Sequence, residues 1–132
     1  MSVVPRPLVM KIDARPPRLD LAGERLIEAG FQLVKAASIK EGIRLARRCN
    51  PHLIVTVDNP RRGFDAVQWL EQQHSDTSVA LAMTPLVVLA DEYRVDRLAI
   101  HELPDRVRIL TQPVNPEQLL AEVRQILSVW RF

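Results

Sequence analysis

The sequence predicts one α/β domain: a doubly wound, flavodoxin-like sheet of five parallel strands with helices on both faces. Short apolar, β-branched runs alternate five times with longer segments of helical period. Helical connections between strands require parallel pairing, and right-handed crossovers place helices on both faces of the sheet. A length of 132 residues suits one domain. We therefore expect residues 1–132 to form a single domain, with residues 1–6 flexible.

The five strands are expected where apolar residues run together. The first is Leu8–Ile12, and the strongest signal is the third, Leu53–Val57. This third run is continuously apolar and rich in β-branched residues, which is typical of a strand covered on both faces. The other three strands are expected at residues 31–37, 85–90 and 107–111.

The first two helices are marked by local signals. The double proline Pro16-Pro17 breaks the chain and can lead into a helical turn, and Gly30 is placed to end that helix. Ser38 followed by Glu41 is a capping-box pattern that opens the second helix. The apolar face of the first helix is expected to hold Leu19, Ala22, Leu26 and Ile27.

The later helices follow the third, fourth and fifth strands. One is expected to hold Val67, Trp69 and Leu70, and another to span residues 92–103. Residues 75–84 fit either an extension of a neighbouring element or a packed loop. The last helix has a good start signal, made of Asn115, Pro116 and Gln118.

The composition is that of an average globular protein, with 47% hydrophobic and 26% charged residues. No apolar run approaches the roughly 18 residues that a membrane span needs. The first residues lack the apolar region of a secretory signal, and one cysteine, Cys49, cannot form an internal disulfide. We therefore expect a cytoplasmic protein. A formal charge of +2 is too small to predict nucleic-acid binding.

Candidate functional residues lie just after the strands. In a doubly wound sheet, ligands bind outside the carboxyl ends of the strands, where we expect Asp13, Asp58 and Asp91. Together these acids could form a weak site for a divalent ion, although Asp91 also suits the N-cap of the following helix. The sequence has no glycine-rich phosphate loop, nucleophile elbow or dinucleotide fingerprint. We therefore expect a binding protein and not an enzyme.

Several motifs in order resemble a two-component response-regulator receiver domain, over about residues 7–127. The acid after the first strand is followed by Pro16 and by the helix-ending Gly30. Residues 58–65 resemble the phosphoacceptor loop, with Gly63 and Asp65 in place, and residues 111–119 resemble the family's Lys-Pro loop and last helix. The resemblance implies a receiver-like (βα)5 fold.

The resemblance also implies a chemistry that this sequence does not fully support. Receivers use two acids after the first strand to hold Mg²⁺ beside an acceptor aspartate, because the negative charges would otherwise repel. They add a hydroxyl after the fourth strand, a switch aromatic in the fifth strand and a lysine after it. Counted back from Gly63 and Asp65 the acceptor is Asp58, and counted forward from Pro51 it is Val57. The remaining positions hold, in order, Ala14, Ala90, Ile109 and Gln112.

These departures predict an atypical receiver, or pseudo-receiver. We expect a phosphorylation-independent protein–protein interaction module in bacterial signal transduction or transcriptional regulation, without a cofactor. One alternative is a conventional phosphoacceptor that uses Asp58, with Mg²⁺ held by Asp13 and Asp58. A second alternative is a small flavodoxin-like enzyme or nucleotide-binding protein. The expected partner is a protein of a signalling pathway or a second copy of the chain, and not a membrane or nucleic acid.

Two surfaces are candidates for contact. The resemblance implies an interaction face over residues 92–130. Large apolar groups at the chain end lack obvious packing partners there, and two more on the neighbouring helix, at positions 93 and 100, add to the same region. These groups are Tyr93, Ile100, Val129, Trp130 and Phe132. A basic stripe on the second helix is typical of a helix face exposed to solvent. Alternatively, it could bind an acidic protein or nucleic acid. The stripe comprises Lys40, Arg44, Arg47 and Arg48.

Overall fold

The computed structural model describes residues 6–15 and 20–129. Its five strands are all parallel and lie in the order β2-β1-β3-β4-β5. The strands are β1 (Leu8–Ile12), β2 (Gln32–Ala36), β3 (Leu53–Val57), β4 (Leu86–Asp91) and β5 (Val107–Gln112). The order reverses direction between β1 and β3, as a doubly wound sheet requires. The predicted fold class is therefore confirmed.

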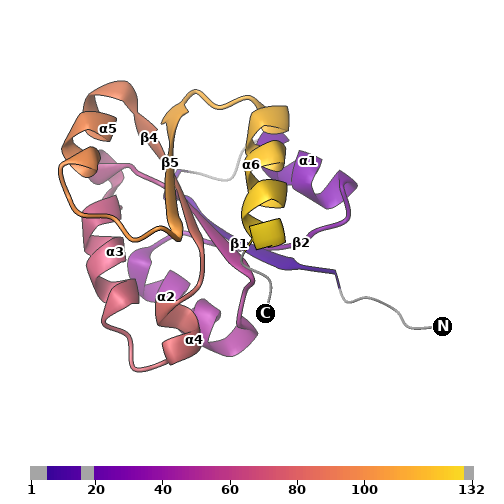
Figure 1. Ribbon diagram of the computed structural model, residues 1–132, viewed down its shortest axis with the longest axis horizontal. Helices are drawn as coiled ribbons and strands as arrows, with labels where there is room; N and C mark the ends of the chain where they lie inside the picture. Colours follow the sequence, from indigo (N-terminus) through magenta and orange to yellow (C-terminus); the bar gives the residue numbers. More distant parts are fainter. Residues whose placement is uncertain (1–5, 16–19, 130–132) are drawn as a thin grey trace.

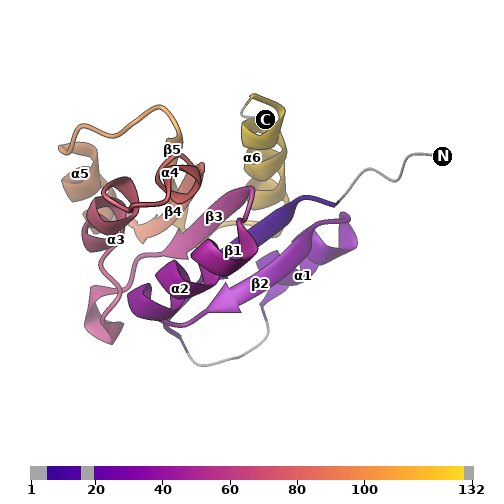
Figure 2. The same ribbon diagram turned by 90° about the horizontal axis from the view of Figure 1, so that it is seen from below.

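Helices cover both faces of this sheet (Figures 1 and 2). On one face lie α1 (Leu21–Glu28) and α6 (Pro116–Val129). On the other face lie α2 (Ile39–Cys49), α3 (Ala66–His74), α4 (Val79–Ala82) and α5 (Glu92–Ala99). A short 3₁₀ helix, η1 (Pro60–Arg62), connects β3 to α3. The strand β5 forms one edge of the sheet. It lies between α5 on one face and α6 on the other (Figure 1).

The helix start and stop signals are confirmed where the structure describes them. The hydroxyl of Ser38 accepts a hydrogen bond from the Glu41 N–H at 3.1 Å, which is the N-cap half of the predicted capping box. The side chain of Asn115 accepts from the Glu117 N–H at 2.8 Å. Gly30 follows the end of α1 with a φ of 100°, in the left-handed region that favours glycine.

Four details differ from the prediction or decide what it left open. The described part of α1 begins at Leu21 and is capped by Asp20, while Pro16, Pro17 and Leu19 lie outside the described residues. Ile27 is 54% exposed, so the core-facing stripe of α1 does not include it. The fifth helix ends at Ala99 and not at residue 103. The open segment 75–84 contains α4.

A buried polar network holds α3, α4 and β4 together. The indole N–H of Trp69, which is fully buried, donates to the Gln73 side chain at 2.8 Å. The amide of Gln73 in turn donates to the carbonyls of Leu81 and Thr84, at 3.0 and 2.8 Å. Buried polar groups that are satisfied in this way rigidify a core. In the described part of the chain, no helix is both long and apolar enough to cross a membrane.

Candidate functional site at the carboxyl ends of the strands

Asp58 is the first residue after β3, and its side chain is completely buried. The backbone N–H of Asp58 donates to the Leu89 carbonyl at 2.8 Å, which fixes the residue beside β4. Its carboxylate accepts a hydrogen bond from the Ala66 N–H at 2.9 Å, at the start of α3. The same carboxylate accepts two more from Arg94, from Nε at 2.8 Å and from Nη2 at 3.2 Å. Both carboxylate oxygens are therefore engaged by groups of the chain itself.

Arg94 lies in the first turn of α5 and is only 13% exposed. Besides Asp58, its Nη2 contacts the Asp65 carboxylate at 3.3 Å. Asp65 also caps α3, because its side chain accepts from the Val67 N–H at 2.8 Å. The hydrogen bond to Asp58 is the main cause that raises the pKa of Arg94 above its usual value. Arg94 thus joins α5 to the loop that follows β3 through a charged, two-pronged contact.

Asp13 is paired separately, with Arg15. The two side chains meet at 2.6 Å between Arg15 Nη2 and Asp13 Oδ2, and the Arg15 backbone N–H adds a bond of 2.9 Å. Burial by itself would raise the pKa of Asp13, but the hydrogen bonds from Arg15 outweigh it and hold the pKa below its usual value. The carboxylate of Asp13 is therefore ionised and already has a cationic partner.

The predicted pocket of Asp13, Asp58 and Asp91 does not form a metal cluster. Asp91 is exposed, and although it occupies the N-cap position of α5, its side chain makes no capping hydrogen bond. Over residues 6–15 and 20–129, no three or more His, Cys, Asp and Glu side chains gather where they could hold a metal ion. Two of the three carboxylates instead have arginine partners, Arg15 for Asp13 and Arg94 for Asp58. As arranged, these residues do not fit a Mg²⁺ ion.

The four other positions that the receiver resemblance singles out place no charged or hydroxyl side chain beside Asp58. Ala14 lies half-buried after β1, and Ala90 is fully buried near the end of β4. Ile109 is half-buried in β5. Gln112 ends β5, and its amide donates to the Leu89 carbonyl at 3.4 Å. None of these four side chains carries a charge or a hydroxyl.

The predicted interaction face is described only in part. Tyr93 and Ile100 are 61% and 82% exposed, and Val129 is 69% exposed. Trp130 and Phe132 lie outside the described residues. Tyr93 belongs to α5 and Val129 to α6, which lie on opposite faces of the sheet on either side of β5 (Figure 1). The exposed apolar groups therefore border the edge strand from two layers.

Sequence reasoning missed Arg94. Its partner Asp58 lies 36 positions away, so no local spacing links the two. The only available signal was general: an aspartate at the end of a fully buried strand needs a counter-charge. Three arginines of residues 92–106 could have supplied it, namely Arg94, Arg97 and Arg106.

The comparisons with known proteins show the fold. No protein-family model and no curated protein matches the sequence. A sensor protein from Polaromonas sp. JS666 superposes with a TM-score of 0.78 at 19% identity, over 95% of this chain and 98% of that one. The signal receiver domain of a signal transduction histidine kinase from Syntrophus aciditrophicus gives 0.77 at 19% identity, over 95% and 92%. The chemotaxis response regulator CheY4 of Vibrio cholerae gives 0.73 at 20% identity, over 93% and 100%. The chain therefore has the fold of response-regulator receiver domains.

Proposed function

We propose that this chain is a pseudo-receiver: a receiver-fold domain that binds another protein in bacterial signal transduction or transcriptional regulation, independently of phosphorylation. Receiver domains of a response regulator and of a histidine kinase share its fold. The observation that carries the proposal is the engagement of the Asp58 carboxylate by Arg94 and by the Ala66 N–H. On this proposal the domain binds and does not catalyse.

We assign the acceptor position to Asp58 and not to Val57. The side chain of Asp58 faces Arg94 and the start of α3, at the carboxyl end of the sheet. Val57 instead packs in the apolar cluster that α1 and α6 form with the sheet. Only Asp58 therefore occupies a position from which a carboxylate could receive a phosphoryl group.

The geometry around Asp58 opposes phosphoryl transfer. An attacking carboxylate oxygen must be available, and a cation must neutralise the developing negative charge. Here Arg94 supplies a cation, but it occupies the oxygens that would attack. Without a hydroxyl at Ala90 or a positive charge at Gln112, nothing else at these positions replaces the partners of a phosphoryl group.

The test is a titration with beryllofluoride and Mg²⁺, which together mimic an aspartyl phosphate, followed by ¹⁵N–¹H NMR. The reporter is the Ala66 amide, because it donates directly to Asp58. We expect its resonance to stay unchanged, both in this titration and in the controls with Mg²⁺ alone or beryllofluoride alone. A saturable shift that requires both reagents would support the conventional phosphoacceptor instead.

For the partner, we propose that the face around β5 mediates contact, with homodimerisation as its simplest form. Tyr93 and Ile100 are large, apolar and mostly exposed, and aromatic residues are enriched at interface anchors. Light scattering at high micromolar concentration should show a dimer for the wild type and a monomer for a Tyr93→Ser, Ile100→Ser variant. A dimer that survives both substitutions would place the contact elsewhere.

A further inference from the structure

A groove of about 890 Å³ lies between α2 and α3, away from Asp58 and from the β5 face. Residues of both helices line it, together with Ser38, which caps α2, and Gly63, which follows η1. The lining consists of Ser38, Ile39, Lys40, Ile43, Arg44, Arg47, Arg48, Gly63, Gln68 and Gln72. The groove therefore includes the whole basic stripe that the sequence analysis identified on the second helix.

The charge of this lining is one-sided. Four of the lining residues are cations and none is a carboxylate. Arg47 is paired with Asp76, which lies between α3 and α4. Lys40, Arg44 and Arg48 are exposed, and within the described part of the chain none of them forms an ion pair. A concentrated positive potential of this kind attracts an acidic partner.

The groove also has apolar walls, and the two helices that form it pack closely against each other. Ile39 is buried and Ile43 half-buried on the side of α2 that packs toward the core. The two helices approach closely, because a Cβ atom at Gly42 would lie only 3.0 Å from the Trp69 ring. Trp69 is itself held by its bond to Gln73. An apolar side chain of a ligand could therefore rest between the two helices while its acidic groups face the cations.

We infer that this groove binds an acidic amphipathic segment of a protein partner, in the helix-in-groove manner. The inference rests on the proposed function in one respect, because it takes the partner to be a protein. Nucleic acid fits less well, since the lining contains no aromatic side chain on which bases could stack. Gln68 and Gln72 on α3 add neutral hydrogen-bonding groups opposite the cations of α2.

The test uses fluorescence anisotropy with a labelled helical peptide that carries glutamates on one face and leucines on the other. A scrambled peptide of the same composition and a thymidine oligonucleotide of the same net charge are the comparison probes. The binding variant is Lys40→Gln, Arg44→Gln, Arg48→Gln. Its matched control removes three other exposed cations, Arg6→Gln, Arg97→Gln and Arg124→Gln, and so has the same net charge.

We expect the amphipathic peptide to bind, and the groove variant to weaken binding about tenfold, since three exposed ion pairs contribute modestly each. The control variant should change affinity less than about twofold. An equal loss in both variants, tighter binding of the oligonucleotide or of the scrambled peptide, or no binding at all would overturn the inference. Circular dichroism checks that both variants remain folded.

The peptide titration does not depend on phosphorylation. The groove proposal and the pseudo-receiver proposal can therefore be contradicted independently of each other. Repeating it after treatment with acetyl phosphate and Mg²⁺ should leave the affinity unchanged. If the domain becomes phosphorylated while the groove still distinguishes the two variants, the pseudo-receiver assignment is wrong and the groove assignment stands.

Discussion

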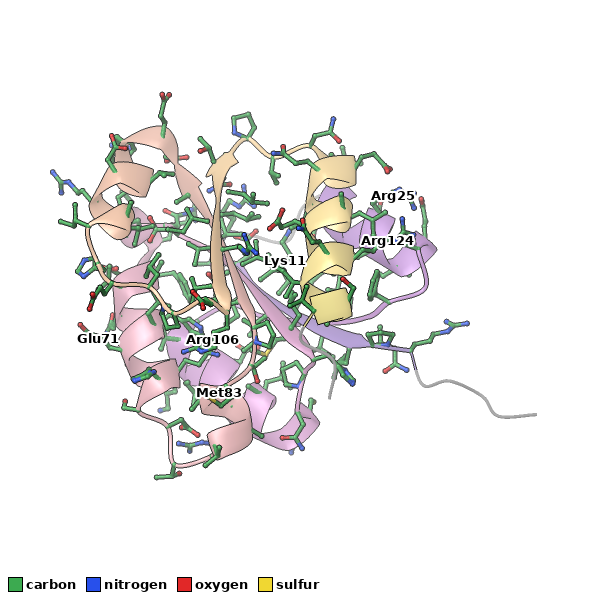
Figure 3. All side chains as sticks on the ribbon, in the orientation of Figure 1. Lys11, Arg25, Glu71, Met83, Arg106 and Arg124 are labelled. Atoms are coloured by element: carbon green, nitrogen blue, oxygen red, sulfur yellow. The ribbon has the colours of Figure 1, made fainter. Side chains whose placement is uncertain are left out.

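Two arginines lie at opposite ends of the sheet, Arg94 half-buried and Arg106 buried, in opposite electrostatic situations. Arg94 lies at the carboxyl end, where it donates to Asp58 and Asp65. Arg106 lies just before β5, at the amino-terminal end of the strand (Figure 3). It is only 4% exposed. Its hydrogen bond to the Thr84 carbonyl is long, at 3.4 Å, and its Nη2 has no partner in the described structure.

The pKa shifts of the two arginines have opposite signs. Hydrogen bonds to Asp58 raise the pKa of Arg94, whereas burial lowers the pKa of Arg106. A cavity of about 230 Å³ lies beside Arg106 and is lined in part by Glu71 and Glu102, but neither acid forms an ion pair with it in the described structure. The fold therefore supplies a carboxylate partner for Arg94 but none for Arg106 in the described structure. At the carboxyl end it supplies Asp58, the residue on which receiver chemistry would depend.

The largest expected effect on stability is at the carboxyl end of the sheet, where Arg94 pairs with Asp58. Arg94→Met should lower the free energy of unfolding by about 3 kcal/mol, because it leaves the fully buried Asp58 carboxylate without its counter-ion. Urea denaturation measures this loss. Adding Asp58→Asn to the same chain should recover part of it, since the second substitution removes the unpaired charge. A double variant as unstable as the sum of the single variants would mean that the two side chains are not coupled.

At Arg106 we expect the opposite change in the free energy of unfolding, because this arginine has no carboxylate partner in the described structure. Arg106→Met keeps an unbranched apolar stem of similar length but removes a buried charge that has no carboxylate partner. We expect the free energy of unfolding to rise by about 1 kcal/mol. A fall of similar size in urea denaturation would show that Arg106 is stabilised in a way that its hydrogen bonds do not indicate.

The smallest expected effect is the dependence on pH at the carboxyl end. The pKa of Asp13 is lowered in the folded state, so its contribution to stability is complete above the usual aspartate pKa and is lost as the pH falls through the folded value. Below about pH 4, Asp13→Asn should therefore lose less stability with falling pH than the wild type. Thermal unfolding across this range measures the slopes, and identical slopes would contradict the role of the Arg15 pair. Arg106→Met should keep the slope of the wild type.

The fold could be predicted because its signals are local. The continuous apolar run Leu53–Val57 became the central strand β3, and the cap at Ser38 and the stop at Gly30 depend only on neighbours in sequence. The position of Ile27 could not be predicted in this way. It adjoins the buried Leu26 on the helix, and the packing of α1 against α6 decides which of the two faces the core.

The site was predicted by position but not by contact. The placement of Asp13 and Asp58 after their strands follows from strand boundaries alone, whereas Asp91 is the last residue of β4 and not the first residue after it. Whether these carboxylates gather around an ion depends on which cations reach them. The pairing of Asp13 with Arg15 spans two positions, whereas the pairing of Asp58 with Arg94 crosses from β3 to α5. A pairing of the second kind emerges only when the sheet is assembled.

The most direct measurement of Asp58 is intact-mass spectrometry of the wild type after treatment with acetyl phosphate and Mg²⁺. We predict no stable phosphoryl adduct, because Arg94 and the Ala66 N–H occupy the carboxylate, Ala90 has no hydroxyl, and Gln112 has no positive charge to hold the phosphoryl group. An Asp58→Asn variant provides the baseline for reaction at other residues. A stoichiometric adduct on the wild type that is missing from Asp58→Asn would contradict the pseudo-receiver assignment and identify a conventional phosphoacceptor.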